Sequence, residues 1–256
     1  MNKKSNSFFR KEKVIDVYRN FNQNNKNLFF LIKKRFNWMN NYISEKNIGI
    51  EIGSGAGFSK FFIKSKKNYL SDITSYFFLD YKKLDAQKMK FKKKFNYIIA
   101  SNVIHHLPYP VSFFYSAHKA LKRKGKIIIF EPNCSLLLKL IIKITKHESY
   151  DFSRKIWKKE RMINSKNIWN GNNAIPNLIF DNKKLFKKNL GHLYRIKYHN
   201  YCECLIFILS GGVYSKSPKI KLNFFFLKLL NLFDIVLSFL APKLFSLGQK
   251  IVLEKI

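Results

Sequence analysis

A short glycine-rich run, EIGSGAG at residues 51–57, follows an apolar segment and precedes an expected helix. Glycines at alternate positions permit positive φ angles and let backbone N–H groups approach a ligand closely. The spacing differs from the G-x-G-x-x-G of dinucleotide sites, and the Gly-Lys-Ser/Thr of a phosphate-binding P-loop is absent. The acid that opens the run, Glu51, suits a ligand that carries an ammonium group.

Acidic residues are scarce around this run, and they lie where expected strands end. Residues 48–134 hold only Glu51, Asp72, Asp80, Asp85 and Glu131, and four of these follow predicted strands. Ligands of open α/β sheets bind outside the carboxyl ends of the strands. Asp72, about 20 residues beyond the glycine loop, therefore suits ribose hydroxyls, and Asp85 suits an adenine edge. Capping of a helix N-terminus is the alternative for both aspartates.

The elements that must position these residues alternate between short apolar strands and helical stretches. This alternation predicts a doubly wound, mostly parallel α/β sheet, closed by an antiparallel terminal pair. The expected strands are Ile48–Ile52, Asn68–Ser71, Tyr81–Leu84, Phe95–Ala100, Lys126–Phe130, Leu193–Tyr198 and Leu205–Leu209, and the helices include 27–43, Phe58–Lys64, Val111–Leu121, Leu136–Thr145 and Asp181–Asn189.

Three segments are expected along the chain. Residues 1–44 form an N-terminal helical segment, 45–210 the α/β domain with a substrate-side insertion at 135–180, and 211–256 a C-terminal amphipathic helical extension. Residues 222–247 are strongly apolar, but their longest stretch without a charged residue is far shorter than the roughly 20 residues of a spanning helix. Packing on the domain and peripheral membrane contact both remain open for this extension.

Composition limits the class of protein further. A hydrophobic fraction of 46% is ample for a core, and three cysteines without framework spacing favour a reducing, cytoplasmic compartment. The net charge of +34 is spread along the whole chain and comes from 42 Lys and only 7 Arg. Arg is the better reader of phosphates and bases, so we interpret the charge as a compositional bias and do not expect specific nucleic-acid binding.

The chain resembles the class I S-adenosylmethionine-dependent methyltransferases, and more narrowly the bacterial small-molecule group that includes the ubiquinone/menaquinone-type enzymes. The matching text is EIGSGAG (51–57), LSD (70–72), LDAQKMKF (84–91), FNYIIASNVIHHLPYP (95–110) and ALKRKGKIIIFEPN (120–133). HESYD (147–151), NNAIP (172–176) and LSGGVYSKS (209–217) are similar to the C-terminal part of methyltransferases found in bacterial cell-surface polysaccharide gene sets.

The resemblance implies a seven-stranded Rossmann-like sheet and S-adenosylmethionine as cofactor. The implied cofactor-binding residues are Glu51, Gly53, Ser54, Gly55, Gly57, Asp72, Ile73, Asp85, Ala86 and Ser101. Glu51 would assist the methionine end, Asp72 would hold the ribose, and Ser101 would lie near the sulfonium.

Methyl transfer to oxygen also needs a base, because the acceptor hydroxyl must lose its proton. The candidate catalytic residues are His105, His106 and His147, and the candidate substrate-binding residues are Glu131, Glu148 and Asn173. Each has a structural alternative: packing or turn capping for the histidines at 105 and 106, tying of the next loop for Glu131, and an exposed or Asn-rich loop for the others. No cysteine or histidine spacing indicates a metal site.

The function expected from these features is O-methylation of a small-molecule or lipid-linked glycan acceptor, at the inner face of the membrane if the C-terminal helices bind lipid. Three alternatives stay open: C-methylation of a quinone-type lipid, RNA methylation, and a non-catalytic S-adenosylmethionine-binding module. The oligomeric state does not follow from the sequence.

Overall fold

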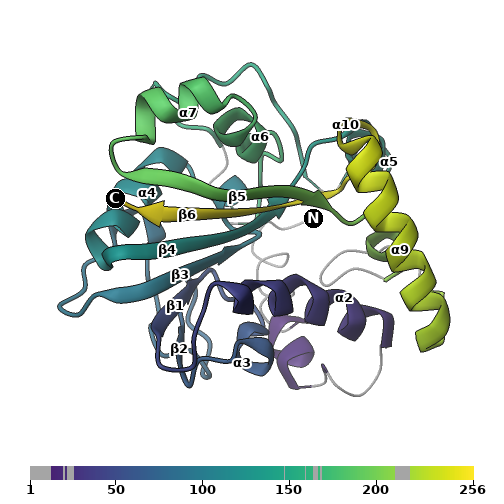
Figure 1. Cartoon of the computed structure of the whole chain (residues 1–256), viewed down its shortest axis with the longest axis horizontal. Coiled ribbons are helices and arrows are strands. Elements are labelled where there is room, and N and C mark those ends of the chain that lie inside the picture. The colour runs from purple at the N-terminus through teal and green to yellow at the C-terminus, as the bar shows by residue number, and fades with distance from the viewer. Residues whose placement is uncertain are drawn as a thin grey trace.

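The computed structural model describes residues 13–19, 21, 26–146, 148–158, 160–163, 167, 169–210 and 220–256. The described part forms a six-stranded sheet in the order β2-β1-β3-β4-β6-β5, with helices on both faces (Figure 1). The strands are β1 Ile48–Ile52, β2 Lys67–Leu70, β3 Phe95–Ser101, β4 Leu121–Pro132, β5 Tyr194–Cys202 and β6 Gly248–Lys255. Strands β2, β1, β3 and β4 pair in parallel, whereas β6 is antiparallel to both of its neighbours.

The helices follow the predicted alternation. They are α2 Lys26–Asn37, α3 Ser59–Phe62, α4 Pro110–Ala120, α5 Leu136–Thr145, α6 Ile175–Phe180, α7 Lys183–Leu190, α8 Leu205–Leu209, α9 Phe224–Leu240 and α10 Pro242–Phe245, with short 3-10 helices η1 Trp38–Asn41, η2 Ala86–Lys88 and η3 Ile104–His106. In Figure 1, α6 and α7 lie above the sheet, and α2 and α3 lie below it.

Two apolar clusters hold the layers together, one on each face of the sheet. Along β3, Ile98 and Ala100 belong to the cluster that includes α4, α6 and α7, whereas Tyr97 and Ile99 belong to the cluster that includes α2. Successive strand side chains point to opposite faces, so an almost continuous apolar strand fills both clusters. This burial fixes the central strands, whose carboxyl ends carry the candidate site.

Two of the seven expected strands are absent and β6 was not expected, so the sheet has six strands rather than seven in the described part of the chain. Of the segment Tyr81–Leu84, only Tyr81 pairs, through a single bridge to Ser71. Lys83 has a φ of 55°, in the left-handed region that a β-strand does not use. The expected third strand is therefore replaced by a loop that leads into Asp85.

The expected strand Leu205–Leu209 is also wrong, because this segment is helix α8. The carboxylate of Asp234 on α9 accepts hydrogen bonds from the backbone N–H groups of Cys204 and Leu205, at 3.0 and 2.7 Å. An acid at this position satisfies the N–H groups that a helix start leaves free. The strand that pairs with β5 is instead β6, in the segment that was expected to be wholly helical.

The apolar C-terminal segment forms the 17-residue helix α9 and then α10, as its amphipathic pattern predicts, before the chain enters β6. Within the described ranges, no helix has both the length and the apolar character needed to cross a membrane.

Candidate functional site

A cavity of about 560 Å³ lies at the carboxyl ends of the parallel strands. Of the ten residues implied to bind cofactor, nine line it: Glu51, Gly53, Ser54, Gly55, Asp72, Ile73, Asp85, Ala86 and Ser101. Gly57 does not line the cavity. A Cβ on Gly57 would lie 2.9 Å from Leu70 Cδ1, so this glycine allows the loop to pack against β2.

The backbone of the glycine loop has a conformation that brings it close to its neighbours and to the cavity. Gly53 and Gly55 have φ angles of 59° and 51°, which L side chains rarely adopt. A Cβ on Gly53 would also lie 2.4 Å from Val103 Cγ2. A side chain at residue 53 would therefore strain the backbone and displace the loop after β3.

Asp72 is held in a fixed orientation beside this loop. Its Oδ2 accepts a hydrogen bond from Gly55 N at 3.0 Å, and its Oδ1 accepts from the backbone N and the hydroxyl of Thr74 at 2.9 and 2.8 Å. Carboxylate oxygens can accept further bonds. The carboxylate is thus oriented by the protein and retains capacity for ligand hydroxyls.

Asp85 caps a short helix, which was the alternative to adenine binding, and it also lines the cavity. Its Oδ1 accepts from Gln87 N at 2.9 Å and so caps η2. The cavity is also lined by Gln87, Thr74 and Asn102, which were not predicted from the sequence. Gln87 follows Ala86 directly and was the easiest of the three to find.

Glu51 is a buried carboxyl, 2% exposed, which faces the cavity and accepts a hydrogen bond from Ser59 Oγ at 2.7 Å. Burial raises its pKa to about 8, against the lowering effect of its hydroxyl partners. Within the described residues it has no cationic side-chain partner at salt-bridge distance. A ligand ammonium group would supply the missing charge.

Cofactor binding is expected to release protons from Glu51. With a pKa of about 8 the carboxyl is mostly protonated at pH 7, and a bound ammonium group favours its ionised form. Titration of S-adenosylmethionine at pH 7 in buffers of different ionisation enthalpy should therefore give buffer-dependent heats that indicate proton release. The Glu51→Gln variant should lose this dependence. Heats that are equal in all buffers would contradict the assigned role.

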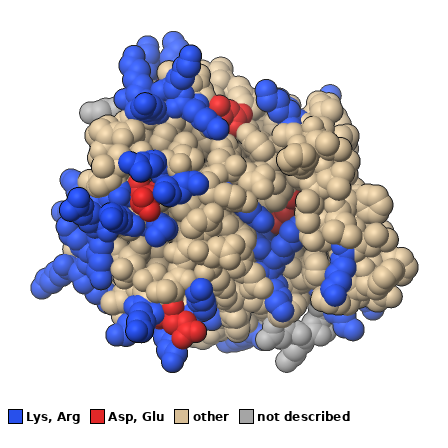
Figure 2. All heavy atoms as spheres, viewed as in Figure 1, with Lys and Arg blue, Asp and Glu red and all other residues tan. Residues whose placement is uncertain are grey.

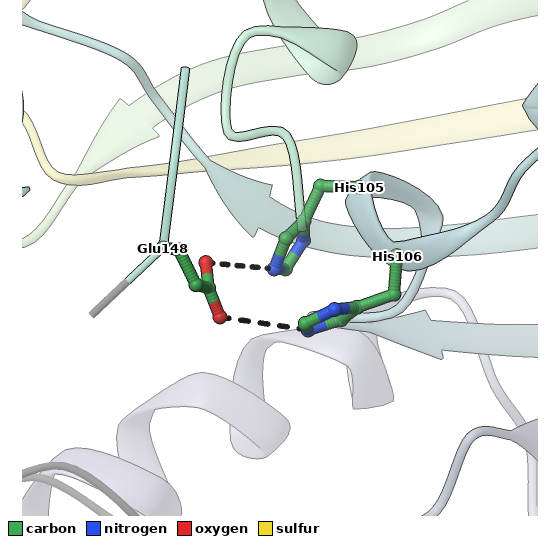
Figure 3. Close-up of side chains that lie close together, drawn as sticks. All are labelled: His105, His106 and Glu148. Carbon is green, nitrogen blue, oxygen red and sulfur yellow. Dashed lines mark ion pairs between the residues drawn. The ribbon is translucent and has the colours of Figure 1, made fainter. Parts of the chain in front are cut away.

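His105 stands between two carboxylates. Its Nδ1 lies 2.6 Å from Glu131 Oε2. Its Nε2 lies 3.6 Å from Glu148 Oε2, and Figure 3 shows this second contact. Burial alone would lower the pKa of His105, but the charge of Glu131, the hydrogen bond to it and the charge of Glu148 outweigh burial and raise the pKa. The imidazole is thereby oriented with Nε2 toward Glu148 and the cavity.

Glu131 lies behind this histidine and does not line the cavity. Its Oε1 accepts from the backbone N–H groups of Val103 and Ile104 at 2.8 and 2.7 Å. It is 0% exposed. Glu131 therefore holds the loop after β3 and orients His105. This is the structural alternative that the sequence left open for Glu131, in place of substrate binding.

Glu148 joins the insertion to the strand-end loops. Its Oε1 lies 3.7 Å from His106 Nε2, and its Oε2 accepts from Asn173 Nδ2 at 2.7 Å. Burial, and after it the neighbouring imidazole of His105, lowers the pKa of His106. Glu148, His106 and Asn173 all line the cavity, whereas His147 lies outside the described residues.

His105, His106 and Glu148 also form a group that could hold a metal ion, since their ligand atoms all lie within 4.8 Å of one another. No metal site was predicted from the sequence, where no cysteine or histidine spacing indicates one; in this group two residues are adjacent and the third is distant in sequence. The absence of a metal stays a prediction, which activity in the presence of a chelator would test.

The far end of the cavity is apolar. Its walls there come from α5 and α8 and from the residue before β6, with the side chains of Leu138, Ile142, Phe207 and Leu247, which pack in one cluster. A cofactor held by Glu51, Asp72 and Asp85 leaves this end free for a second molecule. The lining of the cavity therefore combines polar strand-end groups with an apolar end.

Comparison with known proteins gives one family match and a common fold. Residues 41–127 match a family described as a methyltransferase domain, and none of the curated proteins matches the chain. A SAM dependent methyltransferase from Archaeoglobus fulgidus is 16% identical with a TM-score of 0.51, over 88% of this chain and 93% of its own.

Two further solved structures are similar over most of their length. A SAM-dependent methyltransferase from Methanosarcina mazei is 14% identical with a TM-score of 0.46, over 86% of this chain and 97% of its own. The N-methyltransferase NodS from Bradyrhizobium japonicum, solved with S-adenosyl-l-homocysteine, is 9% identical with a TM-score of 0.42, over 91% of this chain and 89% of its own.

The mixed sheet with its antiparallel β6 and the family match define the class of protein. Residues 41–127 match a methyltransferase domain, and the enzyme is an S-adenosylmethionine-dependent methyltransferase. The sequence predictions of a Rossmann-like α/β fold, of this enzyme class and of this cofactor are confirmed. The residues fit the cofactor, because the buried carboxyl of Glu51, which pairs with no cationic side chain among the described residues, faces the cavity, and Gly53 leaves a cradle that a Cβ would fill.

Proposed function

We propose that the enzyme methylates a hydroxyl oxygen, with His105 as the base. The observation that carries this proposal is the short contact between His105 Nδ1 and Glu131 Oε2, which directs Nε2 toward the cavity. S-adenosylmethionine supplies an electrophilic methyl group when it is bound. Nε2 of neutral His105 accepts the hydroxyl proton, and the carboxylate of Glu131 stabilises the imidazolium that forms.

The remaining residues bind and orient. We assign the ammonium end of the cofactor to Glu51, the ribose to Asp72 and the adenine to the segment that begins at Asp85, while Ser101 lies near the reacting end. Glu148 and Asn173 hold the acceptor beside His105, because both are polar, line the cavity and are bonded to each other. Most of the barrier reduction comes from alignment of the acceptor with the cofactor.

The acceptor class that we propose is a lipid-linked glycan, methylated at the inner face of the membrane. Two features support it: the apolar far end of the cavity, and the resemblance of HESYD and NNAIP to methyltransferases of polysaccharide gene sets. The apolar end also suits a quinone-type lipid, which would be methylated at carbon and is the second candidate.

A transfer assay with S-[methyl-¹⁴C]adenosylmethionine tests this choice. It offers polyprenyl-linked glycans, polyprenyl quinones and RNA in parallel, each with and without a chelator. We expect label on the sugar of the glycan, unchanged by chelation. Label on quinones alone would favour the second candidate, and label on RNA would favour the nucleic-acid alternative. Cofactor binding without label on any acceptor would favour the non-catalytic module.

A further inference from the structure

A broad apolar surface covers one end of the molecule, and it is built by three helices. Ten of the 17 residues of α9 are large apolar side chains exposed to solvent, among them Phe225 at 71% and Phe239 at 79%. Helix α10 contacts both α9 and α5 and adds Leu244. Helix α5 adds Leu140 and Ile144, the latter 81% exposed. We call this surface, formed by α5, α9 and α10, the apolar helical face.

The charges on the apolar helical face have a single sign. Between residues 220 and 247 the one acidic residue is Asp234, which is fully buried and caps α8. Helix α5 contains no acid. The charged side chains that these helices expose are lysines, such as Lys143, Lys228 and Lys243. In Figure 2 the right-hand end of the molecule, over α9, consists mainly of uncharged residues with scattered Lys and Arg.

This combination fits an anionic lipid surface better than an aqueous one. Soluble monomers rarely expose contiguous apolar patches as large as three helices. A helix with exposed aromatic residues and with lysines but no exposed acid lies in the headgroup layer of a bilayer. Negative lipids attract such lysines within a Debye length of the surface. The absence of exposed acids on these helices favours an anionic lipid surface and gives no particular advantage for binding another protein.

Helix α5 connects this face with the apolar end of the cavity. Leu138 and Ile142 point into the cavity, whereas Leu140 and Ile144 are exposed on the apolar helical face. Thr145, at the end of α5, lines the cavity and is itself exposed. The cavity thus reaches the surface beside the apolar helical face, where the hydrocarbon part of an acceptor can remain in lipid.

We propose that the apolar helical face docks on an anionic lipid bilayer and that α5 guides a lipid-anchored acceptor from that bilayer to the cavity. This proposal rests on the proposed function for the nature of the acceptor, but the docking itself does not. The bilayer is expected to contact α9 along its length, since Phe225 and Phe239 lie near its two ends.

Vesicle co-sedimentation of the full chain tests the docking. The vesicles contain either phosphatidylglycerol with phosphatidylcholine or phosphatidylcholine alone. The test variant is Phe225→Glu with Phe239→Glu. The matched control is Tyr115→Glu with Leu185→Glu, on α4 and α7, which changes the net charge equally at exposed apolar residues outside this face. We expect the test variant to bind anionic vesicles at least tenfold more weakly and the control to change less than twofold.

Three results would overturn the proposal: equal loss in both variants, which general basicity explains; no binding by the unmodified chain; and a dimer that dissociates in the test variant without any vesicle binding. S-adenosylmethionine affinity is measured on the same preparations. If the chain binds the cofactor but does not bind vesicles, only the docking is rejected. If the folded, unmodified chain does not bind the cofactor, the proposed function is rejected.

Discussion

Replacing His105 with alanine is expected to lower kcat by about 10²–10⁴-fold, which is the usual contribution of a positioned general base. The affinity for S-adenosylmethionine should stay within about twofold, because the residues assigned to the cofactor are the strand-end acids and the glycine loop. The imidazole of His105 lies between two carboxylates. Its Nδ1 contacts Glu131, and its Nε2 faces Glu148, which lines the cavity. Initial rates with saturating cofactor, together with calorimetry, separate the two effects.

Two variants control this experiment. His192→Gln removes an exposed histidine and should leave kcat unchanged. Glu131→Gln keeps the shape but removes the charge that raises the pKa of His105. Activity requires neutral His105, so it should fall as the pH falls through that pKa. In Glu131→Gln this limb should move to lower pH while the maximal rate decreases. A His105→Ala enzyme with turnover within threefold of the parent would contradict the assignment.

The Asp72→Asn substitution is expected to weaken S-adenosylmethionine binding by about 100-fold. Two charge-assisted hydrogen bonds to ribose hydroxyls become neutral ones, at a cost of about 1.4 kcal/mol each, and 1.4 kcal/mol corresponds to a factor of ten. The asparagine keeps the side-chain shape and its Oδ1 can still accept from Thr74, so the fold should be retained, although its amide NH2 cannot accept from Gly55 N as Asp72 Oδ2 does. Titration calorimetry with the cofactor and with S-adenosylhomocysteine measures the change in Kd.

The matched control for this substitution is Asp181→Asn, which removes the same charge from an exposed residue at the end of α6. Its Kd should equal that of the parent protein. Thermal unfolding checks that both variants are folded. An Asp72→Asn protein that binds the cofactor as tightly as the parent would show that the ribose is held elsewhere.

The central strands and the cofactor end of the site could be predicted from the sequence, because both depend on local signals. Ile48–Ile52 is an apolar run that ends in glycines, and β1 has those same bounds. The acids after the strands could be located because the chain has few of them. The carboxyl ends of parallel strands meet at one edge, so finding the strands was enough to group Glu51, Asp72 and Asp85 around one cavity.

The errors arise where a distant residue decides the outcome. A five-residue apolar run such as Leu205–Leu209 fits a strand or a helix equally well. The carboxylate of Asp234, 29 residues after Leu205, selects the helix. Likewise β6 contains only the short apolar run 251–253, and its place between β4 and β5 depends on pairing with both. Glu131 could not be assigned, since its direction depends on the backbone of the loop after β3.

A crystal structure of the chain with S-adenosylhomocysteine would show how the cofactor lies relative to His105. We expect the ribose hydroxyls on Asp72, the adenine beside Asp85 and Ala86, the amino acid end near Glu51, and the sulfur directed toward His105 with the apolar end of the cavity beyond it. A ligand bound with its sulfur directed away from His105, or bound outside this cavity, would contradict the account.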